Sequence, residues 1–216
     1  MSSSNSLENI IETLAEMKDG EKKAARVREI VPIEEWVNST YYCPDADAIY
    51  PYWKNHIINI FNSPIRINEV IFTGSLGTGK TTIANILLLR RLYELSCYTN
   101  IPALFNLMGS SKLMFAYFNL NLQQAELTGF GQIREMIDRC PYFQEHFPRD
   151  TKNSAAIKFP QANMLIRFAS NTNHTIGTNL IGFHLKQSLG TVWIVYKFNT
   201  SNCWNPIKLA KLQRSI

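Results

Sequence analysis

A glycine-rich segment at residues 74–81, GSLGTGKT, constrains the fold of this chain more than any other feature. It matches the pattern G-x-x-x-x-G-K-[ST] of the phosphate-binding loop at every fixed position. A β-branched and aromatic run at residues 69–73 precedes the segment, and an apolar helical pattern at residues 81–95 follows it. Because the pattern requires a strand before the loop and a helix after it, the sequence predicts an α/β fold of the P-loop NTPase class.

The residue types in this segment suit the binding of phosphate. Glycines allow backbone conformations in which successive N–H groups converge on an anion, and the start of the next helix adds its positive end. Lys80 is expected to reach the β- and γ-phosphates of ATP, and the hydroxyl of Thr81 is expected to ligate Mg²⁺. The predicted nucleotide-binding residues are Gly74, Ser75, Leu76, Gly77, Thr78, Gly79, Lys80, Thr81 and Thr82, with Thr81 as the metal ligand.

The remaining elements follow from hydrophobic periodicity and turn residues. Helices are predicted at residues 7–18, 32–36, 51–61 and, with an interruption near Gly129 and Gly131, 123–138; strands are predicted at 114–118, 157–159, 164–168, 180–185 and 191–196. The strands at 157–159 and 164–168 should form a hairpin. Because strands alternate with helices, a mostly parallel sheet is expected. We divide the chain into an N-terminal helical segment (1–40), an incomplete P-loop ATPase domain (41–185) and a tail without an assigned structure (186–216).

Charge is distributed unevenly along the chain. The net charge is +5, and every Asp and Glu lies at or before Asp150, whereas lysines and arginines continue beyond it. This basic half is either a solvated face or a face for a polyanion such as DNA or a nucleotide. No apolar stretch approaches the length of about 20 residues that spans a membrane, and no signal peptide is recognised. A cytoplasmic location without membrane contact is therefore expected. The four cysteines are scattered and lack the spacing of metal ligands.

A working P-loop ATPase needs acids that lie outside the loop. An Asp at the end of a neighbouring strand holds Mg²⁺, and a further side chain orients the attacking water. The apolar run at residues 180–185 has the character of that strand, but Lys186 and Gln187 follow it, and no acid occurs beyond Asp150. The sequence therefore predicts nucleotide binding without appreciable hydrolysis.

Several segments carry a family resemblance. They are EVIFTGSLGTGKT at 69–81, AELTGF at 125–130, PYF at 141–143 and HTIGTNLIGF at 174–183, with PDAD at 44–47 and YPYW at 50–53 upstream. Together they resemble the ATPase part of the large terminase subunit of tailed phages, over residues 31–185. The loop is shared by many NTPases, whereas the run at 176–183 is more specific to this family.

The resemblance implies an ATP-driven motor that moves double-stranded viral DNA into an empty prohead. It implies a homo-oligomer that works with a small terminase subunit and the prohead portal, in the cytoplasm of an infected host cell. Lys186 and Gln187 then stand where an Asp–Glu pair is expected. We therefore expect residues 186–216 to be foreign sequence from an interrupted or frameshifted gene, poorly packed against the sheet. The alternative is a short paralogue that has lost hydrolysis.

Two other functions stay open at this point. One is a small nucleotide or nucleoside kinase, against which the acid-free half of the chain counts. The other is a nucleotide- or DNA-binding subunit that never hydrolyses ATP.

Aromatic and basic residues near the loop have two interpretations each. Tyr50, Tyr52 and Trp53 lie upstream of the loop and are candidates to stack on adenine, although Trp53 is better explained as a core residue. Arg90 and Arg91 are either fingers for the nucleotide of a neighbouring subunit or, as we favour, the surface end of the loop helix.

Two of the four histidines, His174 and His184, are interpreted as packing or capping residues rather than metal ligands, because no second ligand lies at metal spacing.

Overall fold

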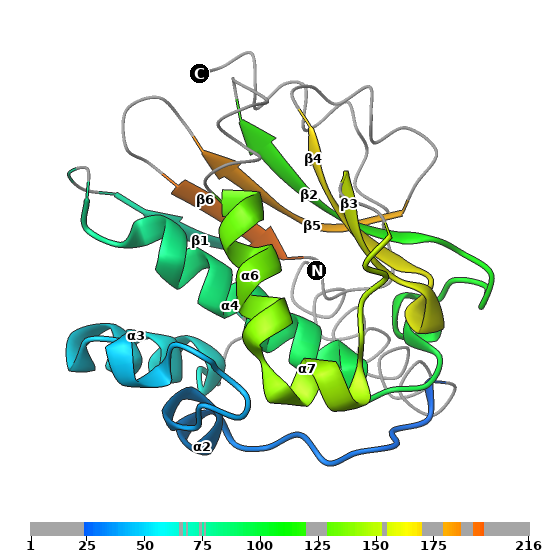
Figure 1. Ribbon diagram of the computed structural model, residues 1–216, viewed down its shortest axis with the longest axis horizontal. Helices are drawn as coiled ribbons and strands as arrows, with labels where there is room; N and C mark the ends of the chain where they lie inside the picture. Colours follow the sequence, from blue (N-terminus) through cyan, green and yellow to red (C-terminus); the bar gives the residue numbers. More distant parts are fainter. Residues whose placement is uncertain are drawn as a thin grey trace, which may run out of the picture.

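A six-stranded sheet lies at the centre of the described chain (Figure 1). The computed structural model describes residues 24–64, 67, 69–73, 75, 77–119, 129–152, 155–169, 179–186 and 192–196. The strands are β1 (Glu69–Phe72), β2 (Leu113–Asn119), β3 (Ala156–Phe159), β4 (Met164–Ala169), β5 (Asn179–Lys186) and β6 (Val192–Tyr196). Their order across the sheet is β1-β6-β5-β2-β4-β3.

Four of these strands run in the same direction. β2 is parallel to β4 and to β5, and β1 shares their direction because both β1 and β5 pair antiparallel with β6. β3 and β4 form the predicted antiparallel hairpin, joined by the 3-10 helix η4 (Pro160–Ala162). The predicted α/β class is therefore confirmed, while the sheet as a whole is mixed.

The position of β6 differs from the expectation of a poorly packed tail. Val192 pairs with Phe72 of β1 on one side and with Lys186 of β5 on the other, and the pairing continues along the strand. Without β6, one edge of each neighbour would present unpaired backbone groups. A β-branched and aromatic run is suited to such a strand. This pairing counts against a foreign tail, at least for residues 192–196; residues 187–191 and 197–216 lie outside the described part.

Helices pack against the sheet and against one another (Figure 1). They are α2 (Ile33–Asn38), α3 (Pro51–Phe61), α4 (Lys80–Ser96), α6 (Gly131–Arg139) and α7 (Pro141–His146), with the 3-10 helices η1 (Ala46–Ala48) and η2 (Ile101–Phe105). α3 starts at Pro51 as predicted, because a first-turn residue needs no N–H partner. α7 and η2 have no counterpart in the prediction. The helix predicted at 7–18 and the first part of the one predicted at 123–138 lie outside the described residues.

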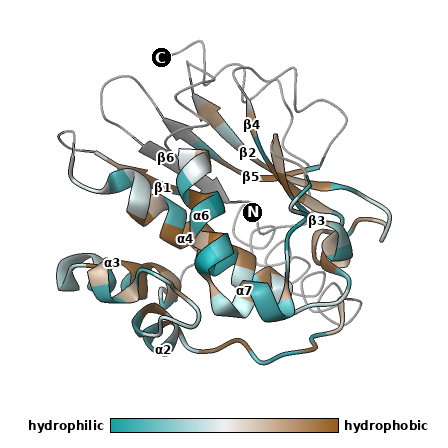
Figure 2. Ribbon diagram, in the orientation of Figure 1, coloured by the Kyte–Doolittle hydropathy of each residue, from teal (hydrophilic) through white to brown (hydrophobic). Residues whose placement is uncertain are grey.

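Helix α4 occupies the middle of the packing. Leu87 and Leu89 are completely buried on different sides of the helix, and Figure 2 shows apolar stretches both here and in the strands. α4 contacts α6 and β6, and Tyr93 of α4 meets the ring of Trp36 in α2. Because neighbours surround it, α4 has to be apolar on most of its circumference. The element that follows the loop is thus held firmly by one hydrophobic core that also includes α2.

None of the helices in the described ranges has both the length and the apolar character needed to cross a membrane.

Candidate functional site

The glycine-rich loop connects the end of β1 to the start of α4. Gly77 and Gly79 have φ angles of 80° and 77°, in the left-handed region that favours glycine. A Cβ atom on either glycine would meet no other atom within 4 Å, so the requirement for glycine is conformational and not one of space. Gly74 and Leu76 of the predicted site lie outside the described residues.

Lys80 is the first residue of α4, and its side chain turns back over the loop. It is 7% exposed, and its ammonium donates to Thr78 Oγ1 at 3.0 Å and to the Ser75 carbonyl. The Thr78 hydroxyl itself donates to the Ser75 carbonyl at 3.1 Å. A positive charge is therefore held above the loop, close to the first turn of a helix whose N–H groups lack partners within the helix.

Thr81 and Thr82 follow Lys80 on the first turn, and both are half-buried. The predicted loop residues that the structure describes are thus gathered at the amino-terminal end of α4. This arrangement can present backbone N–H groups, an ammonium and two hydroxyls to an anion.

A pocket of about 450 Å³ adjoins the loop. Its volume lies in the range of small-molecule sites. Three parts of the chain line it: Asp45, Ala48, Ile49, Tyr50 and Trp53 from the upstream segment; Gly77, Thr78, Gly79, Thr82, Ile83 and Ile86 from the loop and α4; and Gln132 from α6. Asp45 and Gln132 were not among the predicted site residues: Asp45 lies in the PDAD segment but has no local signal of a binding role, and Gln132 has no such signal either.

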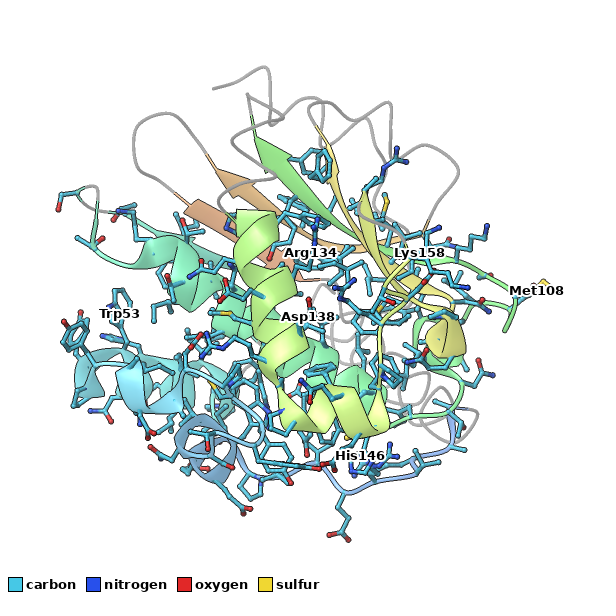
Figure 3. The ribbon with its side chains drawn as sticks, viewed as in Figure 1. Trp53, Met108, Arg134, Asp138, His146 and Lys158 are labelled. Carbon is cyan, nitrogen blue, oxygen red and sulfur yellow. The ribbon has the colours of Figure 1, made fainter. Side chains whose placement is uncertain are left out.

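Two of the three candidate aromatic residues reach this pocket. Trp53 lies in the gap between α3 and α4 (Figure 3), where its ring meets Phe72 edge-on at 5.8 Å and also lines the pocket. Tyr50 lines the pocket and is 75% exposed. Tyr52 is not part of the pocket wall and packs edge-on against His56 at 4.4 Å. Trp53 therefore serves the core and the pocket wall together.

Carboxylates are scarce around the loop. Asp45 is the acid in the pocket wall, and its Oδ1 forms an ion pair with Arg139 Nη2 at 3.1 Å. Across the described ranges, no group of three or more His, Cys, Asp or Glu side chains is placed to hold a metal ion. Within the part of the chain that the structure describes, no carboxylate set therefore accompanies the hydroxyl of Thr81, the predicted Mg²⁺ ligand.

The predicted strand at 180–185 is present as β5, which extends to Lys186. Lys186 is in register with Asn119 at the end of β2, so neither strand carries an acid at its last position. β6 lies between β5 and β1, the strand that leads into the loop. His184 is 3% exposed and stacks near Tyr117, with ring centroids 4.8 Å apart, which agrees with a packing residue. His174 lies outside the described residues.

Arg90 and Arg91 are not the surface end of α4. The Arg90 side chain is 5% exposed and the Arg91 side chain 14% exposed, and both pair with Glu94 at 3.1 Å and 2.7 Å. Both guanidinium groups also pack on the Phe61 ring. The favoured interpretation from sequence, the surface end of the loop helix, is therefore wrong, and the same burial counts against a trans-acting finger.

The α/β sheet, the left-handed glycine turn and the helix that follows it are compatible with a P-loop-like domain. Comparison of the chain with protein-family models, with curated proteins and with solved structures gives no match.

Proposed function

We propose that this chain binds ATP with Mg²⁺, with the phosphates on residues 74–82 and the base in the adjoining pocket. The observation that carries the proposal is the turn of Gly77 and Gly79 into α4, over which Lys80 folds its ammonium. A left-handed glycine turn at the start of a buried helix collects N–H donors, helix dipole and a cation at one point. Triphosphate is the biological anion that such a combination fits best.

The pocket supports a nucleotide rather than a simple anion. The rings of Trp53 and Tyr50 offer stacking surfaces for a base, and Thr82 and Ile86 of α4 line the same pocket. Asp45 is the acceptor in that wall, and its carboxylate pairs with Arg139 at 3.1 Å. A carboxylate acceptor favours a base that carries an exocyclic amino group, as adenine does.

In the proposed complex each loop residue has one task. Lys80 pairs with the β- and γ-phosphates, the loop N–H groups hold the phosphate oxygens, and Thr81 provides a ligand for Mg²⁺. When bound, Mg²⁺ neutralises charge on the phosphates. We further propose that turnover is negligible, because β5 ends at Lys186 and no acid follows Asp150.

The wider role that we propose is the ATP-binding part of a viral DNA-packaging motor. The terminase-like segments of the sequence support it, together with the basic character of the chain beyond Asp150. Double-stranded DNA, a small terminase subunit, a prohead portal and further copies of this chain are the proposed partners. A subunit that binds nucleotide without ever hydrolysing it is the second candidate, favoured by the scarcity of carboxylates near the loop.

Calorimetric titration with ATP and Mg²⁺ tests the binding. Lys80→Ala should weaken affinity at least tenfold, since a charged hydrogen bond contributes about 1.5–3 kcal/mol. Lys158→Ala, which removes an exposed lysine of β3 outside the pocket, is the matched control and should bind like wild type. Equal affinities for wild type and Lys80→Ala would refute nucleotide binding at the loop. Steady-state ATP hydrolysis by the purified chain would refute the absence of turnover.

A further inference from the structure

A relay of side-chain hydrogen bonds, formed by Tyr117, Asn85, Gln132 and Thr82, leads from the sheet to the edge of the pocket. The Tyr117 hydroxyl of β2 donates to Asn85 Oδ1 at 2.6 Å, and Asn85 Nδ2 donates to Gln132 Oε1 at 3.1 Å. Gln132 Nε2 then donates to Thr82 Oγ1 at 2.9 Å. Asn85 and Tyr117 are buried, and the two residues at the other end line the pocket. The four side chains come from three elements, α4, β2 and α6.

One backbone carbonyl fixes the donor-to-acceptor direction of every hydrogen bond in this relay. Asn85 Nδ2 also donates to the Gly129 carbonyl at 3.0 Å, and a carbonyl oxygen can only accept. The amide nitrogen of Asn85 therefore faces Gly129 and Gln132, and its oxygen faces Tyr117. Gln132 must then accept from Asn85 with its oxygen, which turns its own NH₂ group towards Thr82. No member can reverse without leaving two donors or two acceptors face to face.

The consequence appears at Thr82. A hydroxyl has one proton to donate, and accepting from Gln132 leaves that proton available. Thr82 is at once a residue of the phosphate-loop segment and a residue of the pocket wall. In the proposed complex its hydroxyl lies between the triphosphate on the loop and the base in the pocket, and the α-phosphate joins these two parts of the nucleotide. The relay delivers an oriented O–H donor to that position.

The support of the relay is rigid. Gly129 leaves room for the Tyr117 ring, because a Cβ atom at that position would lie 3.2 Å from the ring. Phe130 and His184 flank the same ring, with centroids 6.1 Å and 4.8 Å away. The buried members of the network, Asn85 and Tyr117, are therefore held in one arrangement.

We infer that Gln132 is a positioning residue for nucleotide binding, which holds the Thr82 hydroxyl as a donor to the α-phosphate. The inference rests on the proposed function of the loop and adds a residue outside the loop motif to it. It also specifies the ligand group that is recognised, namely a phosphate joined to a nucleoside.

The test compares AMP, ADP, ATP and adenosine as ligands of the full chain, in direct or competition titrations. Gln132→Met keeps the size of the side chain and removes both hydrogen bonds. It should lower the affinities for the three phosphorylated ligands by similar factors of about ten and leave the affinity for adenosine unchanged, because only the α-phosphate contact is lost. Thr82→Val should act in the same way. The double variant should lose no more affinity for the phosphorylated ligands than either single variant does.

Two further variants guard against a loss of folding as the cause. Gln132→Glu retains the shape but can only accept, which turns the Thr82 O–H away from the ligand. It should lower the affinity for phosphorylated ligands at least as far as Gln132→Met does. Gln161→Met changes a glutamine of η4 outside the pocket and should bind like wild type. Far-ultraviolet circular dichroism and thermal midpoints verify that each variant is folded.

Additive effects of the Gln132 and Thr82 substitutions would overturn the inference, as would unchanged affinities in Gln132→Met. Equal weakening of adenosine would also overturn it, since Gln132 would then act on the base. If wild type and Lys80→Ala bind ATP equally, the proposed function itself fails. Loss of affinity in Lys80→Ala with none in Gln132→Met refutes the relay alone.

Discussion

A guanidinium group lies inside the core of this protein. Arg90 on α4 is 4% exposed, and the ring centroids of Trp36, Phe61 and Tyr93 lie 5.5, 5.7 and 5.1 Å from its central carbon. Its Nε donates to Glu94 at 3.1 Å. Burial lowers the pKa of Arg90, while the nearby Glu94 carboxylate acts in the opposite direction. The rings and this one carboxylate therefore offset the cost of keeping a cation out of water.

Removing that carboxylate should be costly. Glu94→Ala leaves Arg90 buried without its ion-pair partner, and we expect the free energy of unfolding to fall by about 3 kcal/mol. Glu135→Ala is the control, because Glu135 is largely exposed and its removal should change stability by less than about 0.5 kcal/mol. Urea unfolding followed by tryptophan fluorescence measures both. Similar midpoints for the two variants would show that the buried pair does not stabilise the fold.

Some residues of the candidate site and the core could be predicted from the sequence, and others could not. The loop from Gly77 to Lys80 was predictable because its pattern is contiguous and each position has its own chemical reason. Arg90 was not, because two of the three rings that enclose it come from α2 and α3, and adjacent arginines on a helix resemble a solvated face. Gln132 was not predictable either, since its partner Thr82 lies on another helix and is far away in the chain.

At the scale of elements, α3 could be predicted from local signals, whereas the place of β6 in the sheet depends on distant parts of the chain. Pro51 and the helical spacing of Ile57 and Phe61 are local signals, and they give α3 its observed bounds. The β-branched run in β6 indicates a strand, but it carries no information about which strands it joins. Its pairing with β1 and β5 is decided by the edges that those strands leave open.

A proline in β6 tests its central position. Ile194 pairs with Val70 on one side and His184 on the other, so Ile194→Pro removes a backbone donor from a strand with neighbours on both sides. We expect a loss of about 3 kcal/mol or more in stability, measured by chemical unfolding. Ile194→Val keeps the backbone donor and should cost no more than about 1.5 kcal/mol. An Ile194→Pro variant as stable as wild type would mean that β6 does not belong to the sheet.

For the whole molecule, buried thiols and phenols set the response to alkaline pH. Burial raises the pKa of Cys140 from 9.0 to about 11, that of Cys43 from 9.0 to about 12 and that of Tyr142 from 10.0 to about 12. The unfolded chain loses these protons near the ordinary values, while the folded protein retains them. The contribution of these groups to the free energy of unfolding is therefore fully present below about pH 9 and is lost as the pH rises towards 11–12.

Urea unfolding at pH 7, 9 and 10.5 measures this dependence. The midpoint should change little between pH 7 and 9 and fall at pH 10.5. In Cys140→Ala the fall should be shallower, by up to about 1.4 kcal/mol per pH unit, because one of the titrating groups is absent. A midpoint that is constant up to pH 10.5 would contradict the assignment of these groups to the interior.

The pairing of β1 with β6 has a consequence for the order of events during synthesis. β1 is the edge strand that leads into the loop, and its residue Glu69 pairs with Val195. A ribosome adding 5–20 residues per second needs on the order of ten seconds to travel from one partner to the other. Throughout that interval the nascent chain has its glycine loop but not the strand that ties β1 into the sheet. The amino-terminal end of α4, which is the proposed phosphate site, is therefore fixed in place only after residues 192–196 have been made.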